Sequence, residues 1–180
     1  EEDKTLDAPE LDTERRAVQL IALGAPMAAD LREVVAALKI SGVVERIGDY
    51  AKNIARRVPK LDGASAIEPV SLLPEMARIA TEMVSDVLQA FVDRDADGAV
   101  RVVERDEALD DFYDSIFRTL LTHMMENPQT IGQSAQLLFL AKNLGRDGVP
   151  ATKLPEMVYY APTGDRLAEP PKKGTPAGRA

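Results

Sequence analysis

The feature that most constrains this fold is an apolar seam that repeats with the period of an α-helix. Ile40, Val44, Ile47, Ala51 and Ile54 follow one another at steps of four and three residues, which places them along one side of a helix. Similar patterns continue through most of the chain, and no stretch shows the alternation or the hairpin turns of a β-sheet. The sequence therefore predicts an all-α fold of long antiparallel helices joined by short turns.

Prolines and glycines divide this helical chain into segments. Pro9 lies inside the first segment, so that helix either begins with an irregular turn or begins at Pro9 itself. Two glycines and two prolines crowd residues 145–155, and we expect them to split the last segment into two shorter helices. The predicted helices cover 1–23, 26–58, 71–93, the stretch from the break at 94–100 to residue 125, and 130–160, with a polar linker at 59–70 and a disordered tail at 163–180.

An internal repeat relates the two halves of the chain. The segment "EEDKTLD" at 1–7 matches "ERDEALD" at 104–110, and each is followed by a break containing proline and then by another helix. In the second half a further helix precedes the matched pair, whereas the first half has none. We therefore expect tandem three-helix bundles, a first unit at 1–58 that lacks its first helix and a second at 71–162. The chain does not begin with Met, and we expect residues upstream of Glu1.

Composition excludes several classes of function. Acidic residues outnumber Lys plus Arg by 30 to 22, giving a formal charge of −8, so binding to nucleic acid or to an anionic membrane surface is not expected. No apolar run is long enough to insert into a membrane. The chain is 45% hydrophobic but only 4% aromatic, so Leu, Ala, Val, Ile and Met must fill its core.

The sequence also lacks residues that several known catalytic sites require. There is no Cys, which excludes thiol catalysis. The only histidine is His123, so a nucleophilic site that needs a second histidine is excluded as well. A carboxylate-bridged di-iron oxidase needs two Glu-x-x-His motifs, but Leu120 stands three residues before His123. Nucleotide-binding glycine loops are missing as well, so we expect neither an enzyme nor an organic cofactor.

A stripe of oxygen-bearing side chains marks the second predicted helix. Glu45, Asp49 and Asn53 recur every four residues, nearly opposite the apolar seam. Carboxylates at this spacing repel each other, and we expect the nearby Arg46 and Lys52 to point elsewhere. The stripe is either a solvated acidic face or part of a binding site.

The same acidic spacing occurs on two other predicted helices, at Asp3 and Asp7 and at Asp106 and Asp110. If consecutive helices are antiparallel neighbours, the pair Asp3 and Asp7 meets Glu45 and Asp49 in one patch of four carboxylates. Hard or borderline cations such as iron, manganese, magnesium or calcium take such oxygen ligands.

The segment "PMAADLREVVAALKISGVVERIGDYAKNIARR" resembles the first signature helix of the PhoU family, in which each repeat carries an E/D-x-x-x-D motif. The stretches "ERDEALDDFYDSIFRTLLTHMMENPQTI" and "MVYYAPTGD" resemble its second repeat. This resemblance implies tandem three-helix bundles that hold iron or another divalent metal at these motifs. It also implies a cytoplasmic, homodimeric regulator that works with the ATPase subunit of the high-affinity phosphate transporter and with a phosphate-sensing histidine kinase. Such a regulator represses the phosphate-starvation response when phosphate is plentiful.

Carried over by position, the resemblance gives two metal sites of unequal quality. The first comprises the aspartates at 3 and 7 with Glu45 and Asp49, and Asn53 follows in register. The second keeps Asp106 and Asp110, but its partner motif is replaced by "GRDGVPATKLPE", with Gly145, Val149 and Lys153 at the ligand positions. We therefore expect the second metal site to be absent or impaired. The alternative is a metal-free helical scaffold whose acidic faces keep it in solution.

Overall fold

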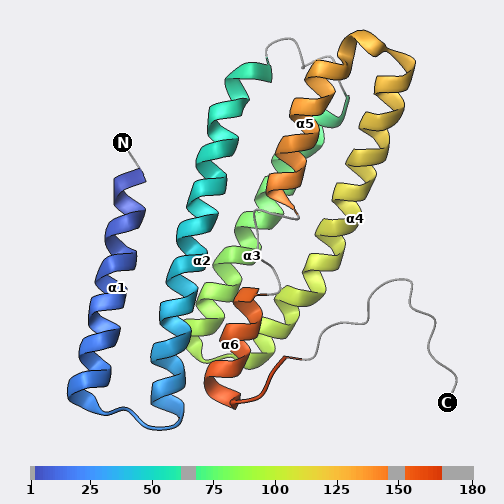
Figure 1. Ribbon diagram of the computed structural model, residues 1–180. Coiled ribbons are helices and arrows are strands. Elements are labelled where there is room, and N and C mark those ends of the chain that lie inside the picture. The colour runs from blue at the N-terminus through green and yellow to red at the C-terminus, as the bar shows by residue number, and fades with distance from the viewer. Residues whose placement is uncertain (1–2, 62–67, 146–152, 168–180) are drawn as a thin grey trace, which may run out of the picture.

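The computed structural model describes residues 3–61, 68–145 and 153–167, and six α-helices account for most of them (Figure 1). Short 3-10 helices, η1 (Val58–Leu61), η3 (Glu68–Leu72) and η4 (Pro128–Thr130), lie between some of them. No strand occurs in these ranges, which confirms the all-α prediction. The helices are α1 (Asp3–Gly24), α2 (Ala29–Arg57), α3 (Leu73–Asp93), α4 (Ala96–Glu126), α5 (Ile131–Leu144) and α6 (Lys153–Thr163).

The helix ends lie within a few residues of the predicted breaks, although α4 begins at Ala96, inside the predicted break at 94–100. A larger difference occurs at Pro9. The chain is α-helical from Asp3 and continues through Pro9, so both expectations for this start, an irregular turn or a start at Pro9, were wrong. A proline inside a helix removes one backbone hydrogen bond. The contact of α1 with α2 along its length offsets that loss.

The last predicted helix is interrupted where glycines and prolines cluster. α5 ends at Leu144, Gly145 caps it with a φ of −94°, and α6 begins at Lys153. The expected division into two shorter helices is confirmed, and residues 146–152 lie outside the described residues. The described chain also continues to residue 167, past the predicted start of the tail at 163.

The turn between α3 and α4 depends on the conformations and contacts of three nearby residues. Arg94 adopts a left-handed conformation with a φ of 56°, and the Asp95 carboxylate then accepts a hydrogen bond of 2.9 Å from the Gly98 N–H. A Cβ atom at residue 98 would lie 2.7 Å from Asp95 Oδ2 and 3.0 Å from the Ala90 Cβ. Glycine at 98 therefore allows α4 to start close against α3.

The core lies among α3, α4, α5 and α6 and is almost entirely aliphatic. α4 is the central element, because it contacts α3, α5 and α6. Aliphatic and methionine side chains fill this core, as the low aromatic content predicts. Its largest fully buried side chains include Met76, Met83, Leu109, Ile116, Leu120, Leu137 and Leu154.

The first unit is an antiparallel hairpin of α1 and α2, and α2 packs against this core (Figure 1). Ala36 and Ile40 of α2 are buried in the same hydrophobic cluster as the side chains of α3 to α6. Val44, Ile47 and Ile54 pack against that cluster, whereas Ala51 is exposed. The predicted seam of α2 thus faces the second unit, apart from that one position.

Polar contacts at both ends of α2 strengthen this junction. Arg32 donates hydrogen bonds to the carbonyls of Ala161, at 3.2 Å, and Pro162, at 3.4 Å. At the other end, Arg57 donates to Gln136 Oε1 at 3.0 Å, and its guanidinium lies 3.5 Å from the centre of the Phe139 ring. α2 is therefore tied to both α6 and α5.

None of the helices in residues 3–61, 68–145 and 153–167 combines the length and apolarity needed to cross a bilayer.

Candidate functional site

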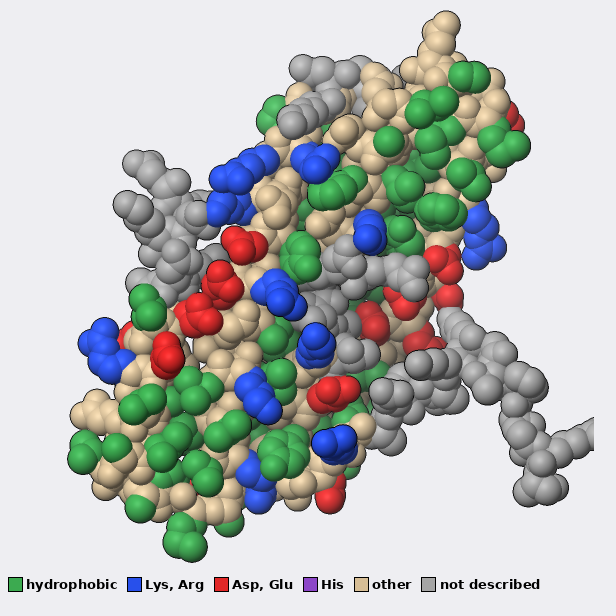
Figure 2. Space-filling view, in the orientation of Figure 1, with side chains coloured by type: hydrophobic (Ala, Val, Ile, Leu, Met, Phe, Trp, Pro, Cys, Tyr) green, Lys and Arg blue, Asp and Glu red, His purple; other side chains and the backbone are tan. Residues whose placement is uncertain are grey.

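The acidic stripe of α2 lies on the side of the helix away from the shared core. Glu45 is half-buried, while Asp49 and Asn53 are exposed. Figure 2 shows acidic side chains gathered over the α1–α2 hairpin. The stripe is therefore accessible to a ligand from solvent.

One expectation about this stripe was wrong. Lys52 does not point away from it, because its Nζ atom lies 3.8 Å from Asp49 Oδ1. Both side chains meet solvent, so the pair contributes little stability. The lysine nevertheless relieves part of the repulsion between the carboxylates and would have to move if Asp49 bound a cation. Its position three residues after Asp49 on a helix was the signal for this contact.

The backbone register brings the two acidic motifs of the first unit to the same level. A Cβ atom at Gly42 would lie 3.3 Å from Glu10 Oε1, so residues 10 and 42, which sum to 52, lie side by side. Along two antiparallel helices, the numbers of facing residues add up to the same value. Asp7 therefore lies level with Glu45, and Asp3 lies level with Asp49. The side chains of residues 1–9 lie outside the described residues, and the metal ligation of Asp3, Asp7, Glu45, Asp49 and Asn53 stays a prediction.

The chemistry of these groups fits a hard or borderline cation. The donors are carboxylates and one amide oxygen, which suit iron, manganese, magnesium and calcium, and there is no thiolate. Among the side chains that the structure describes, no group of three or more acidic or histidine residues is arranged around a common point. A complete ligand set in the first unit therefore needs α1 to contribute.

The acidic pair of the second unit has a different environment. On α4, Asp106 is half-buried and Asp110 is exposed. Burial, together with the negative charges of Asp110 and Glu107, raises the pKa of Asp106 to about 6. Asp106 therefore holds its proton to a higher pH than an ordinary aspartate.

The described part of the partner motif does not supply ligands to this pair. Gly145 is buried, and a Cβ atom there would lie 2.6 Å from Met76 Cε and 3.6 Å from the Tyr113 Cβ. A carboxylate side chain at that position would have to displace the buried Met76 methyl group. Lys153 is exposed at the start of α6, and Val149 lies outside the described residues. These contacts support an absent or impaired second metal site, which stays a prediction together with ligation by Asp106 and Asp110.

The structure also brings together residues that the sequence pattern did not single out. A pocket between α2 and α6 is lined by Lys39, Tyr160 and Arg166, among others. Lys39 and Arg166 are 127 residues apart in sequence, so no local spacing could have paired them.

Comparison with known proteins identifies the relatives of this fold. A model described as the PhoU domain matches residues 1–58 and 73–156. A protein of Zymomonas mobilis, named phosphate-specific transport system accessory protein PhoU homolog, is 50% identical over 169 residues, which cover 94% of this chain and 71% of that protein. The protein of the same name from Caulobacter vibrioides is 44% identical over 166 residues, covering 92% of this chain and 72% of the relative.

Solved structures agree with the sequence comparison. The crystal structure of PhoU from Pseudomonas aeruginosa superposes with a TM-score of 0.83 at 30% sequence identity, covering 91% of this chain and 79% of that one. The family model matches both units, and the identities extend over nearly the whole chain. The chain therefore belongs to the PhoU domain family.

Proposed function

We propose that this chain is an accessory regulator of phosphate uptake. In this role it contacts the ATPase subunit of a high-affinity phosphate transporter at the cytoplasmic side of the membrane. Together with a phosphate-sensing histidine kinase it represses the phosphate-starvation response when phosphate is plentiful. The observation that carries the proposal is the 50% identity to a phosphate-specific transport accessory protein over 94% of the chain.

The composition and the acidic surface of α2 support a role in binding. The chain has one histidine and no cysteine, and the exposed acidic stripe of α2 offers a contact surface. We include iron or another divalent metal in the proposal, held by Asp3, Asp7, Glu45 and Asp49 with Asn53 beside them. A bound cation would neutralise the carboxylates and link α1 to α2.

Deleting the gene for this chain tests the regulatory role. In high phosphate, a reporter driven by a phosphate-starvation promoter should rise in the deletion strain and return to its repressed level when the gene is restored. A reporter that stays repressed in the deletion strain would contradict the proposal. Co-purification of the transporter ATPase from cells that express the restored gene tests the partner separately.

Metal analysis distinguishes the metal-bound protein from the alternative, a metal-free scaffold, which the Asp49–Lys52 ion pair favours. Protein purified without chelator should contain metal that falls sharply in Glu45→Ala/Asp49→Ala. The matched control is Glu82→Ala/Asp86→Ala, an exposed pair with the same spacing on α3 that already pairs with Arg105. Equal metal content in all three proteins would favour the scaffold.

The proposal also includes a homodimer. The side chains of Leu11, Val18 and Leu23 on α1 are 62%, 59% and 79% exposed, and apolar side chains left in solvent favour association. Light scattering should give twice the mass of 19.6 kDa. A monomeric mass at micromolar concentration would remove the dimer from the proposal.

A further inference from the structure

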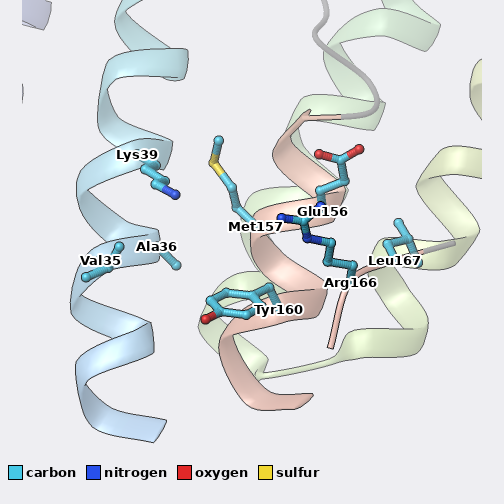
Figure 3. Close-up of a pocket in the computed structure, with 8 residues that line it drawn as sticks. All are labelled: Val35, Ala36, Lys39, Glu156, Met157, Tyr160, Arg166 and Leu167. Atoms are coloured by element: carbon cyan, nitrogen blue, oxygen red, sulfur yellow. The ribbon is translucent and has the colours of Figure 1, made fainter. Parts of the chain in front are cut away.

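A pocket of about 750 Å³ lies between α2 and α6, and residues 166–167 border it on one side (Figure 3). Its volume lies within the range of roughly 300–1,000 Å³ that is usual for small-molecule sites. Apolar side chains form about half of its described lining. Val35 and Ala36 come from α2, Met157 comes from α6, and Leu167 follows α6. A ligand that fills the pocket must therefore carry an organic body.

Two cations border the same pocket. Lys39 projects from α2, and Arg166 reaches back from the segment after α6, with the charged ends of both directed toward the space between the helices (Figure 3). Neither forms an ion pair with another described residue. The Tyr160 ring extends from α6 toward α2, and Glu156 is the one acidic side chain among the described residues of the lining. Two positive charges and one negative charge give the described lining residues a net charge of +1, in a protein of formal charge −8.

The position of Arg166 is fixed by the fold rather than by a free chain end. The Arg32 guanidinium donates to the carbonyls of Ala161 and Pro162. The turn that follows has a φ of 78° at Gly164, where a Cβ atom would lie 3.3 Å from Arg32 Cζ. Arg32 therefore holds the end of α6 and the turn after it against α2, which directs Arg166 toward Lys39.

We propose that this pocket binds a small phosphomonoester with a flat organic body. The planar guanidinium of Arg166 takes two phosphoryl oxygens, and the Lys39 ammonium takes a third. The body stacks on the Tyr160 ring and lies against Val35, Ala36 and Met157. Glu156 accepts hydrogen bonds from hydroxyl or amino groups of that body, which a plain fatty acid lacks. This binding goes beyond the accessory role and does not depend on it.

Calorimetric titration with AMP as the probe tests the proposal. AMP should bind measurably, and Lys39→Met and Arg166→Met should each weaken binding by roughly tenfold or more, because each removes a charge-assisted contact. Glu156→Gln should strengthen binding, since it keeps a hydrogen-bond acceptor and removes the negative charge that Glu156 places near the phosphoryl group. Arg118→Met, which removes an exposed arginine from the far half of α4, is the matched control and should leave affinity unchanged.

Three further ligands decide which part of the proposal holds. Adenosine and inorganic phosphate should each bind much more weakly than AMP, because each uses only one half of the pocket. Inorganic phosphate that binds as tightly as AMP would overturn the role of the apolar walls. Decanoate that binds while AMP does not would show a lipid-like anion instead. Absence of AMP binding by a folded protein, verified by circular dichroism, would overturn the proposal, and the deletion strain described above would still test the accessory role.

Discussion

At the scale of single residues, Asp106 and Asp110 show how environment separates two identical side chains on α4. Asp106 is half-buried with a pKa of about 6, whereas Asp110 is exposed. In the unfolded chain the pKa of an aspartate is about 3.9. The folded protein therefore binds more protons at Asp106 between about pH 4 and pH 6, and the free energy of unfolding falls as pH rises through that window.

The variant Asp106→Asn should remove this loss of stability at higher pH. Because the carboxylate still meets solvent, we discount the effect and expect the variant to be more stable than the parent by on the order of 1 kcal/mol at about pH 7. No gain is expected at about pH 4, where the parent carboxyl is itself protonated. Urea unfolding with chelator at both pH values measures the difference. Asp110→Asn removes only the neighbouring charge and leaves the half-buried carboxyl in place, so its gain should be smaller. An equal gain from both variants would contradict burial as the main cause.

Gly145 supports a second prediction at this scale. Its missing Cβ would press on Met76 Cε, and Met76 is fully buried, so the methyl group has little room to move. Gly145→Ala should lower the free energy of unfolding by about 1–3 kcal/mol through overpacking. Gly132→Ala, near the start of α5 and with nothing within 4 Å of the added atom, should leave stability unchanged or raise it. Similar losses in both variants would show that packing at 145 is not the cause.

Sequence alone could identify the candidates of the first site but not all their contacts. The spacing of Glu45, Asp49 and Asn53 follows directly from the helical period, and it correctly placed them away from the core. The contact between Lys52 and Asp49 depends on the rotamer of a long side chain, which periodicity does not determine. The pocket residues Lys39 and Arg166 meet only because α6 folds back onto α2, a long-range arrangement that no local pattern encodes.

At the scale of helices, Arg57 shows how one side chain orients two elements. The sequence pattern places Arg57 near the end of a helix and gives it no partner, yet Arg57 contacts both Gln136 and Phe139 of α5. Helix ends could be predicted because prolines and glycines act locally at 59 and 145. The pairing of α2 with α5 could not, because it depends on side chains 79 residues apart.

Arg57→Ala should therefore destabilise the contact between these helices. The loss of one hydrogen bond and of the cation–π contact with the Phe139 ring should lower the free energy of unfolding by about 1–2 kcal/mol. Arg56→Ala changes the neighbouring exposed arginine and should cost less than about 0.5 kcal/mol. Thermal unfolding of the two variants side by side measures the difference. An equal effect would mean that the charge near the helix end, rather than the contact with α5, is responsible.

At the scale of the whole molecule, α1 is the element with the least support. Its main neighbour is α2, and Ala17 is its one buried side chain among those described. α3 and α4, in contrast, enclose the core residues Met83, Leu109 and Ile116. Local opening requires the least free energy where few apolar contacts are lost. The backbone amides of α1 should therefore exchange with deuterium earlier than those of α3 and α4.

The same measurement connects this uneven stability to the proposed metal. If carboxylates of α1 and α2 share a cation, ligand binding to the closed hairpin lowers the population in which α1 is detached. Added manganese should then slow exchange in the first turns of α1 in the parent and leave Glu45→Ala/Asp49→Ala unaffected. α3 serves as the internal reference, because its exchange should not respond to the metal. Slowing of α1 to the same extent in both proteins would show that the cation acts elsewhere, and no slowing in either would indicate that α1 does not contribute ligands.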